Sequence, residues 1–133
     1  MKQIAFRLLP GQFLKEEIVY AAKKNDIRAG VLLSIVGGLE NAVLRMAGAT
    51  SEHQDIKEFT GPFEIVSGTG TISQDGCHIH ISISDQEGKV IGGHLKDGCK
   101  VAPTAEIVIG ILETRSFTRV YDKNTGFKEL EIQ

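Results

Sequence analysis

Three histidines in the second half of the chain have the types and the spacing of metal ligands. His78 and His80 are separated by one residue, and His94 lies in the next extended segment. Because residues two apart on a strand point to the same face, the first two imidazoles are expected side by side. Three imidazoles with a fourth position open are typical of a zinc site, and imidazole also accepts other divalent ions. The pattern therefore predicts a site for zinc or another divalent metal.

The turn between the two segments decides whether His94 can join the other two histidines. Residues 77–84 alternate between Cys or Ile and polar side chains, as a half-buried strand does. The next four residues suit a type I turn with a G1 bulge at its glycine, which pairs Asp85 with Lys89. His80 then faces His94, whereas a register shifted by one residue would send His94 to the opposite face. In the alternative interpretation, these histidines belong to a polar outer face or pack against another subunit.

Several other side chains are candidates for chemistry. Glu64 and Glu106 lie in otherwise apolar strands, where a carboxylate is paired, exposed at an edge or functional. Either could orient a metal ligand or act as a general base, and the sequence does not place them relative to the histidines. Cys77 falls on the apolar face of its strand and is expected to be inert, and Cys99 has no assigned role. His53 is expected in a polar surface loop.

Some functional classes find no support in the sequence. The 15 basic and 17 acidic side chains give a net charge of −2, and the densest basic run is Lys23-Lys24. Direct binding to DNA is therefore not expected. Gly68-Thr69-Gly70 lies within a strand with no helix after it, which excludes a dinucleotide-binding loop. No serine lies in a G-x-S-x-G elbow. The two cysteines give no disulfide framework, and neither a signal peptide nor a membrane span is apparent, which favours a cytoplasmic protein.

The elements that must position these residues follow from hydrophobic periodicity. A helix is expected from Gln12 to about Asn25, with its apolar stripe at Leu14, Ile18, Ala21 and Ala22. Residues 48–61 are expected to form a loop. The expected strands are 2–8, 31–36, 42–47, 63–73, 77–84, 89–95, 104–115, 117–122 and 127–132. We predict a single α+β domain over residues 1–133, with a mainly antiparallel curved sheet of about seven to eight strands and one long helix packed on it.

One strand also bears on assembly. The segment from Thr104 to Glu113 carries apolar side chains at both alternating positions, which indicates burial on both faces. In a chain with one helix to cover the sheet, this favours either a central strand or contact with a partner subunit. The sequence therefore favours a homo-oligomer.

Motifs along most of the chain occur in an order that points to one family. Ile27-Arg28-Ala29-Gly30 is followed by Gly37-Gly38 and by Asn41-Ala-Val-Leu-Arg45. Next come Gly61-Pro-Phe-Glu-Ile-Val66 and His78-Ile-His80, and then the block Gly88-x-Val90-x-Gly92-Gly93-His94-Leu95 and Thr104-Ala-Glu106. From about residue 4 to residue 120, the chain resembles the plant and prokaryote conserved (PPC) domain family, in its stand-alone bacterial and archaeal form.

The resemblance carries expectations of its own. It implies a compact α+β domain that forms homotrimers through its sheet, with zinc or another metal at His78, His80 and His94. In plants, the similar domain follows an AT-hook that contacts DNA, and stand-alone prokaryotic members are named DNA-binding proteins by that analogy. This chain has no Arg-Gly-Arg-Pro hook.

Three functions are therefore open at this point. The first is a homotrimeric binding or assembly module whose histidines hold a metal, structural or able to receive a small-molecule ligand. The second is a metal-dependent enzyme of hydrolase or lyase type, in which zinc activates a water molecule and Glu106 acts as general base. The third is association with DNA, directly or through a partner, and the charge argues against the direct form.

Overall fold

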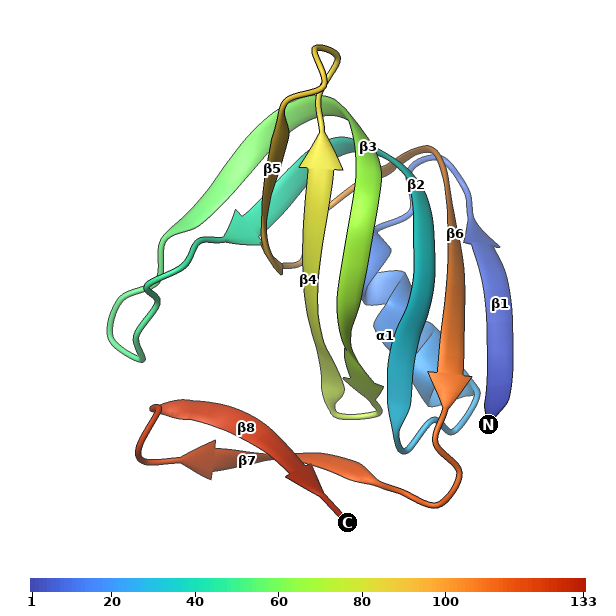
Figure 1. Cartoon of the computed structure of the whole chain (residues 1–133), viewed down its shortest axis with the longest axis vertical. Helices are drawn as coiled ribbons and strands as arrows, with labels where there is room; N and C mark the ends of the chain where they lie inside the picture. Colours follow the sequence, from blue (N-terminus) through green and yellow to red (C-terminus); the bar gives the residue numbers. More distant parts are fainter.

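Eight strands and one helix make up the chain, and the computed structural model describes all residues, 1–133 (Figure 1). The first elements are β1 (Lys2–Leu8), α1 (Leu14–Lys24), β2 (Gly30–Arg45), β3 (Ile56–Ser73) and β4 (Gly76–Ser84). They are followed by β5 (Val90–Leu95), β6 (Val101–Ile111), β7 (Phe117–Asp122) and β8 (Phe127–Ile132). Six strands form an antiparallel sheet in the order β1-β6-β2-β3-β4-β5, and β7 and β8 form a separate hairpin. The prediction of a mainly antiparallel α+β fold is confirmed.

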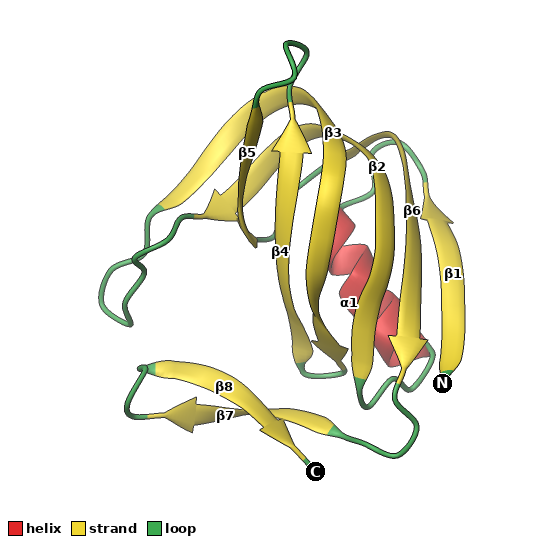
Figure 2. Cartoon of the chain, in the orientation of Figure 1, coloured by secondary structure: helices red, strands yellow, loops and turns green.

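The six-stranded sheet is strongly curved. β2 and β3 bend over at one end and continue past β5, as Figure 2 shows. The end of β2 then pairs with β5 through Leu44 and Leu95, so that the two sides of the sheet meet. This curvature encloses the apolar side chains on one face of the sheet.

β2 is one continuous strand where the sequence predicted two. Gly37 and Gly38 do not end the strand. Their lack of a side chain instead allows the backbone of β6 to pack closely against β2. A Cβ atom added at Gly37 would lie 2.2 Å from the carbonyl oxygen of Thr104 on β6. The register of β2 against β6 shifts at this point, and the ladder then continues. The glycines therefore allow close approach of two backbones within a sheet.

The segment 48–61 is also more ordered than expected. β3 begins at Ile56, which pairs with Arg45 at the end of β2. Residues 56–61 lack the buried apolar face that would predict a strand, because none of them is fully buried. The prediction of a loop was therefore wrong for the last part of this segment.

The helix is short, so the prediction of one long helix was wrong. α1 has eleven residues. It starts after Phe13, which is extended, and in the turn before it the side chain of Gln12 accepts a hydrogen bond from the Leu9 N–H. It ends at Asn25, whose side-chain amide donates to the carbonyl of Ala21. Its buried residues are those predicted, Leu14, Ile18, Ala21 and Ala22.

The core lies between α1 and the concave face of the sheet (Figure 2). On β4, Ile79, Ile81 and Ile83 are buried there. The intervening side chains of β4 therefore project from the opposite face, which we call the outer face. His78 and His80 belong to it. No helix covers this face, and the single helix lacks the length and hydrophobicity to span a membrane.

The C-terminal hairpin lies across the ends of β3 and β4 (Figure 1). The N–H of Phe117 at its start donates to the carbonyl of Arg28. Further along β7, Arg119 donates from Nη2 to the hydroxyl of Thr71 on β3, at 2.8 Å. These contacts bring the hairpin alongside the histidine-bearing part of the outer face.

Candidate metal centre

The β4–β5 hairpin sets the position of the three histidines. The Asp85 N–H donates to the Lys89 carbonyl at 3.0 Å, and the glycine of the turn, Gly88, has φ +81°, as a G1 bulge requires. In the resulting register, His80 pairs directly with His94. The turn and the register that the sequence predicted are confirmed.

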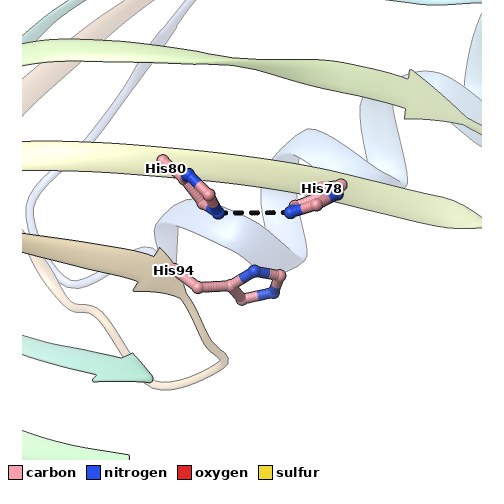
Figure 3. Close-up of side chains that lie close together, drawn as sticks. All are labelled: His78, His80 and His94. Atoms are coloured by element: carbon pink, nitrogen blue, oxygen red, sulfur yellow. Dashed lines mark hydrogen bonds between the residues drawn. The ribbon is translucent and has the colours of Figure 1, made fainter. Parts of the chain in front are cut away.

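The three imidazoles converge on one point, as Figure 3 shows. Their ring centroids are 4.8 to 5.4 Å apart, and one ligand nitrogen from each lies within 4.8 Å of the others. The Nε2 atoms of His78 and His80 are 3.2 Å apart. Two nitrogens bound to a tetrahedral zinc at about 2.0–2.1 Å are themselves about 3.3 Å apart. The donor set and its spacing therefore fit a zinc-type ion after a small movement of His94.

Burial favours the neutral form of two of these imidazoles. It lowers the pKa of His94 from 6.5 to about 3, with a further contribution from the charge of Arg45. Burial is also the main cause that lowers the pKa of His78, and the neighbouring His80 is the second cause. Since a metal binds only the unprotonated nitrogen, both residues can coordinate an ion without first losing a proton at neutral pH.

Acid should destabilise the metal-free protein through His94. Because its folded pKa lies below its unfolded value, the unfolded chain binds more protons between pH 6.5 and about 3. The free energy of unfolding is therefore highest above pH 6.5 and falls as the pH drops through this window, by at most about 1.4 kcal/mol per pH unit. The slope should be smaller than this, because His94 is partly exposed. Urea denaturation of the metal-free wild type and of His94→Gln at several pH values measures it, and equal slopes would contradict the prediction.

Two clefts adjoin the histidines. One, of about 730 Å³, contains His78 and His94 together with basic and acidic side chains from α1, β2, β7 and β8. The other, of about 590 Å³, lies on the side of His80 and includes Gly92 and Gly93. A Cβ atom at Gly92 would lie 2.5 Å from the carbonyl oxygen of Ile81, so this glycine also permits close strand contact. A small ligand thus has access to the metal position from either side.

Other predicted candidates lie elsewhere. Glu106 is exposed on β6, and β2 and β3 separate that strand from β4, which places it roughly 14 Å from the histidines across the sheet. Glu64 is exposed on β3 opposite Ser84, at the other end of the hairpin. Neither carboxylate lines the two clefts. His53 is exposed in the loop between β2 and β3.

The two cysteines are free, and burial is the main cause that raises the pKa of each thiol to about 11. Cys99 is fully buried and accepts a hydrogen bond from the Val43 N–H at 3.2 Å. Both thiols are therefore protonated at neutral pH, and neither has the character of a nucleophile.

The sequence did not reveal the charged residues around the histidines. Arg45 comes from the end of β2, and its Nη2 lies 3.4 Å from Nδ1 of His94. Lys96 follows β5, and Arg119 and Glu129 come from the C-terminal hairpin. Arg45 ends the Asn41-Ala-Val-Leu-Arg45 motif, but the motif does not show that this residue lies beside His94. Arg119 and Glu129 reach the cleft only because the C-terminal hairpin packs there.

Comparison with known proteins assigns the family. Residues 1–113 match the model of the Plants and Prokaryotes Conserved (PCC) domain. The chain belongs to this family. The fold agrees with solved structures, including a Salmonella enterica protein that is 36% identical, with a TM-score of 0.92 over 99% of this chain and 93% of that one. The PCC assignment confirms the resemblance seen in the sequence motifs.

Two further solved structures are similar to the PCC chain. A metal-containing protein of Archaeoglobus fulgidus is 27% identical, with a TM-score of 0.86 over 98% of this chain and 94% of that one. A Bacteroides thetaiotaomicron protein named as a candidate DNA-binding protein has a TM-score of 0.87 over 97% of this chain and 91% of that one. At 20% identity, that second likeness shows the fold alone.

Among curated relatives, the bifunctional protein GlmU of a Synechococcus strain is 39% identical over 133 residues. The match covers all of this chain and 20% of GlmU. The PCC chain therefore spans about a fifth of the length of the curated relatives it matches.

Proposed function

We propose that this PCC protein binds one divalent metal ion per chain, zinc or a similar ion, through His78, His80 and His94. The observation that carries the proposal is the convergence of three ligand nitrogens within 4.8 Å on a hairpin of defined register. The metal-containing Archaeoglobus protein, similar over 98% of this chain, supports it. The ion would keep one coordination position open toward the adjoining clefts.

A bound ion of this kind acts as a Lewis acid and lowers the pKa of a coordinated water. We infer that the primary role of the site is to bind a small molecule at the open position. The sequence contains no nucleophile motif, and both thiols have a raised pKa, so a covalent mechanism finds no support.

Metal analysis tests the proposal directly. Protein purified without a His-tag and dialysed against zinc should retain about one zinc per chain by elemental analysis, because three imidazoles are already gathered at one point. A chain that takes up no zinc, cobalt or nickel under these conditions would show that the histidines serve only as surface or interface residues.

A hydrolase or lyase is the second function that the site supports. Its general base would have to lie near the metal, and Glu106 does not do so within one chain. Glu129 on β8 lines the same cleft as His78. Burial lowers the pKa of that histidine, and the charge of Glu129 opposes this shift in small part. We therefore infer that Glu129 is the better candidate for a base that accepts a proton from a metal-bound water.

Assembly as a homotrimer is the third part of the proposal. Leu33, Val36 and Val66, on the neighbouring strands β2 and β3, are 46%, 50% and 55% exposed on the uncovered outer face. An apolar patch on a sheet face typically marks an interaction surface. Trimers through the sheet are also what the family resemblance implies.

We do not extend the proposal to direct DNA binding. The net charge of −2 argues against a phosphate-binding surface on this domain. The basic residues that do cluster line a cleft beside the histidines, and acidic side chains lie among them.

A further inference from the structure

Four basic side chains line the cleft beside the histidines without a carboxylate partner. One of them, Lys128, is exposed, and the other three are half-buried. Arg45, Lys96 and Arg119 all line the cleft of about 730 Å³ that contains His78 and His94. The ion pairs of the chain are Lys15–Asp97, Lys57–Asp55 and Lys100–Glu40, so no carboxylate lies within 4.0 Å of the three. The cleft also contains Glu16, Asp75, Asp97 and Glu129. Among these four, Asp97 is already bound to Lys15.

The two arginines are held in place and still have free donors. Arg119 uses Nη2 to donate to Thr71, whose strand partner is His78. The guanidinium of Arg45 lies 5.3 Å from the centre of the Phe127 ring, in a cation–π contact. Because a guanidinium has several N–H groups in one plane, each arginine can still bind an oxyanion.

Metal binding would release Arg45 from His94. The Nη2 of Arg45 can only donate, so the Nδ1 of His94, 3.4 Å away, is the acceptor. A neutral imidazole that coordinates a metal has no acceptor left, because one nitrogen binds the ion and the other carries a hydrogen. The guanidinium must then find another acceptor in the same cleft.

We propose that Arg45, Lys96 and Arg119 form a subsite that binds the oxyanion of a small ligand, a carboxylate or phosphoryl group, next to the metal. The proposal rests on the metal site proposed above. An oxyanion is the group that can contact both a divalent ion and a planar guanidinium, and it would supply the acceptor that Arg45 loses. The cleft has the volume of a small-molecule site.

The C-terminal hairpin supplies part of this subsite. Arg119 and Phe127 lie after residue 113, where the match to the PCC domain ends. The histidines come from the family region, and part of the anion subsite comes from the hairpin.

Cobalt-loaded protein allows the subsite to be tested. Inorganic phosphate and acetate are titrated separately into the full chain with bound Co²⁺, and the visible spectrum of the ion reports binding. Arg119→Gln should leave the cobalt stoichiometry unchanged and raise the Kd of the better anion about 10- to 100-fold, because it removes charge-assisted hydrogen bonds. Lys123→Gln removes the same charge from the exposed turn of the hairpin and should change the Kd less than about twofold. The anion that binds more tightly identifies the ligand group.

The remaining outcomes separate the two proposals. If cobalt binds but neither anion changes its spectrum, or if both variants bind anions equally, the subsite is refuted and the metal site stands. If cobalt does not bind, the metal proposal fails. Phosphate and acetate are then titrated into the metal-free chain, with the arginine side-chain NMR signals as the readout. Shifts that are lost in Arg119→Gln would support the subsite, and their absence would refute it.

Discussion

Replacing His80 with alanine is expected to abolish stoichiometric zinc binding while leaving the fold intact. His80 is the central member of the cluster, since it pairs with His94 across the hairpin and its Nε2 lies 3.2 Å from that of His78. Loss of a group that only orients a metal ligand lowers the affinity for the metal about 10- to 100-fold. Loss of the ligand itself should lower the zinc affinity further. Competition with a chromophoric chelator measures the change.

Thermal stability gives an independent measurement of the same effect. An ion that binds only the folded chain, present at about 1,000 times its Kd, adds about 4 kcal/mol to the free energy of unfolding. For a chain of this size, the Tm should then rise by on the order of 10 °C. Zinc should produce this rise in the wild type and little of it in His80→Ala. The side chain of His80 is exposed, so the metal-free variant should unfold near the metal-free wild type.

His53→Ala is the matched control, because it removes the fourth histidine of the chain from an exposed loop. It should retain the zinc affinity and the zinc-dependent Tm of the wild type. An equal loss of zinc affinity in His80→Ala and His53→Ala would indicate non-specific binding to surface imidazoles. Unchanged binding in His80→Ala would remove His80 from the site.

The β4–β5 hairpin could be predicted from the sequence because the residues that determine it are close together in the chain. Turn chemistry around Gly88 sets the register, and alternation along β4 sets the face, so the pairing of His80 with His94 followed from fewer than twenty consecutive residues. The helix stripe was readable for the same reason. The end of the helix near Asn25 was predicted too, whereas its start at Leu14 lies two residues after the predicted one, because Gln12 belongs to the preceding turn.

Features that depend on distant segments could not be predicted. The alternation of side chains along β6 places Glu106 on the same face of the sheet as the histidines. Only the strand order shows that two strands lie between Glu106 and β4. Arg45, Arg119 and Glu129 reach the cleft from β2, β7 and β8. Gly37 illustrates a third limit, because a glycine that admits a neighbouring backbone has the same sequence signal as one that ends a strand.

Substituting Val36 with lysine is expected to convert the proposed trimer into monomers. Val36 is 50% exposed near the middle of the outer face, beside β3. Placing a lysine in an apolar contact between subunits costs several kcal/mol, which corresponds to about a 100-fold or greater loss of association. Within one chain the change should be tolerated, because Glu106 lies opposite Val36 on β6 and can pair with the new ammonium group. Light scattering at micromolar concentration should give the mass of three chains for the wild type and of one for Val36→Lys.

The control must add the same charge to a valine that is equally exposed but lies outside the patch. Val120 on β7 is 47% exposed and belongs to the separate hairpin, so Val120→Lys should keep the wild-type mass. A monomeric wild type would refute the trimer, whereas a trimer that survives Val36→Lys would place the interface elsewhere. Metal content measured on the same samples then separates assembly from metal binding. Zinc retained by monomeric Val36→Lys would show that one chain supplies all three ligands, as the β4–β5 hairpin does here.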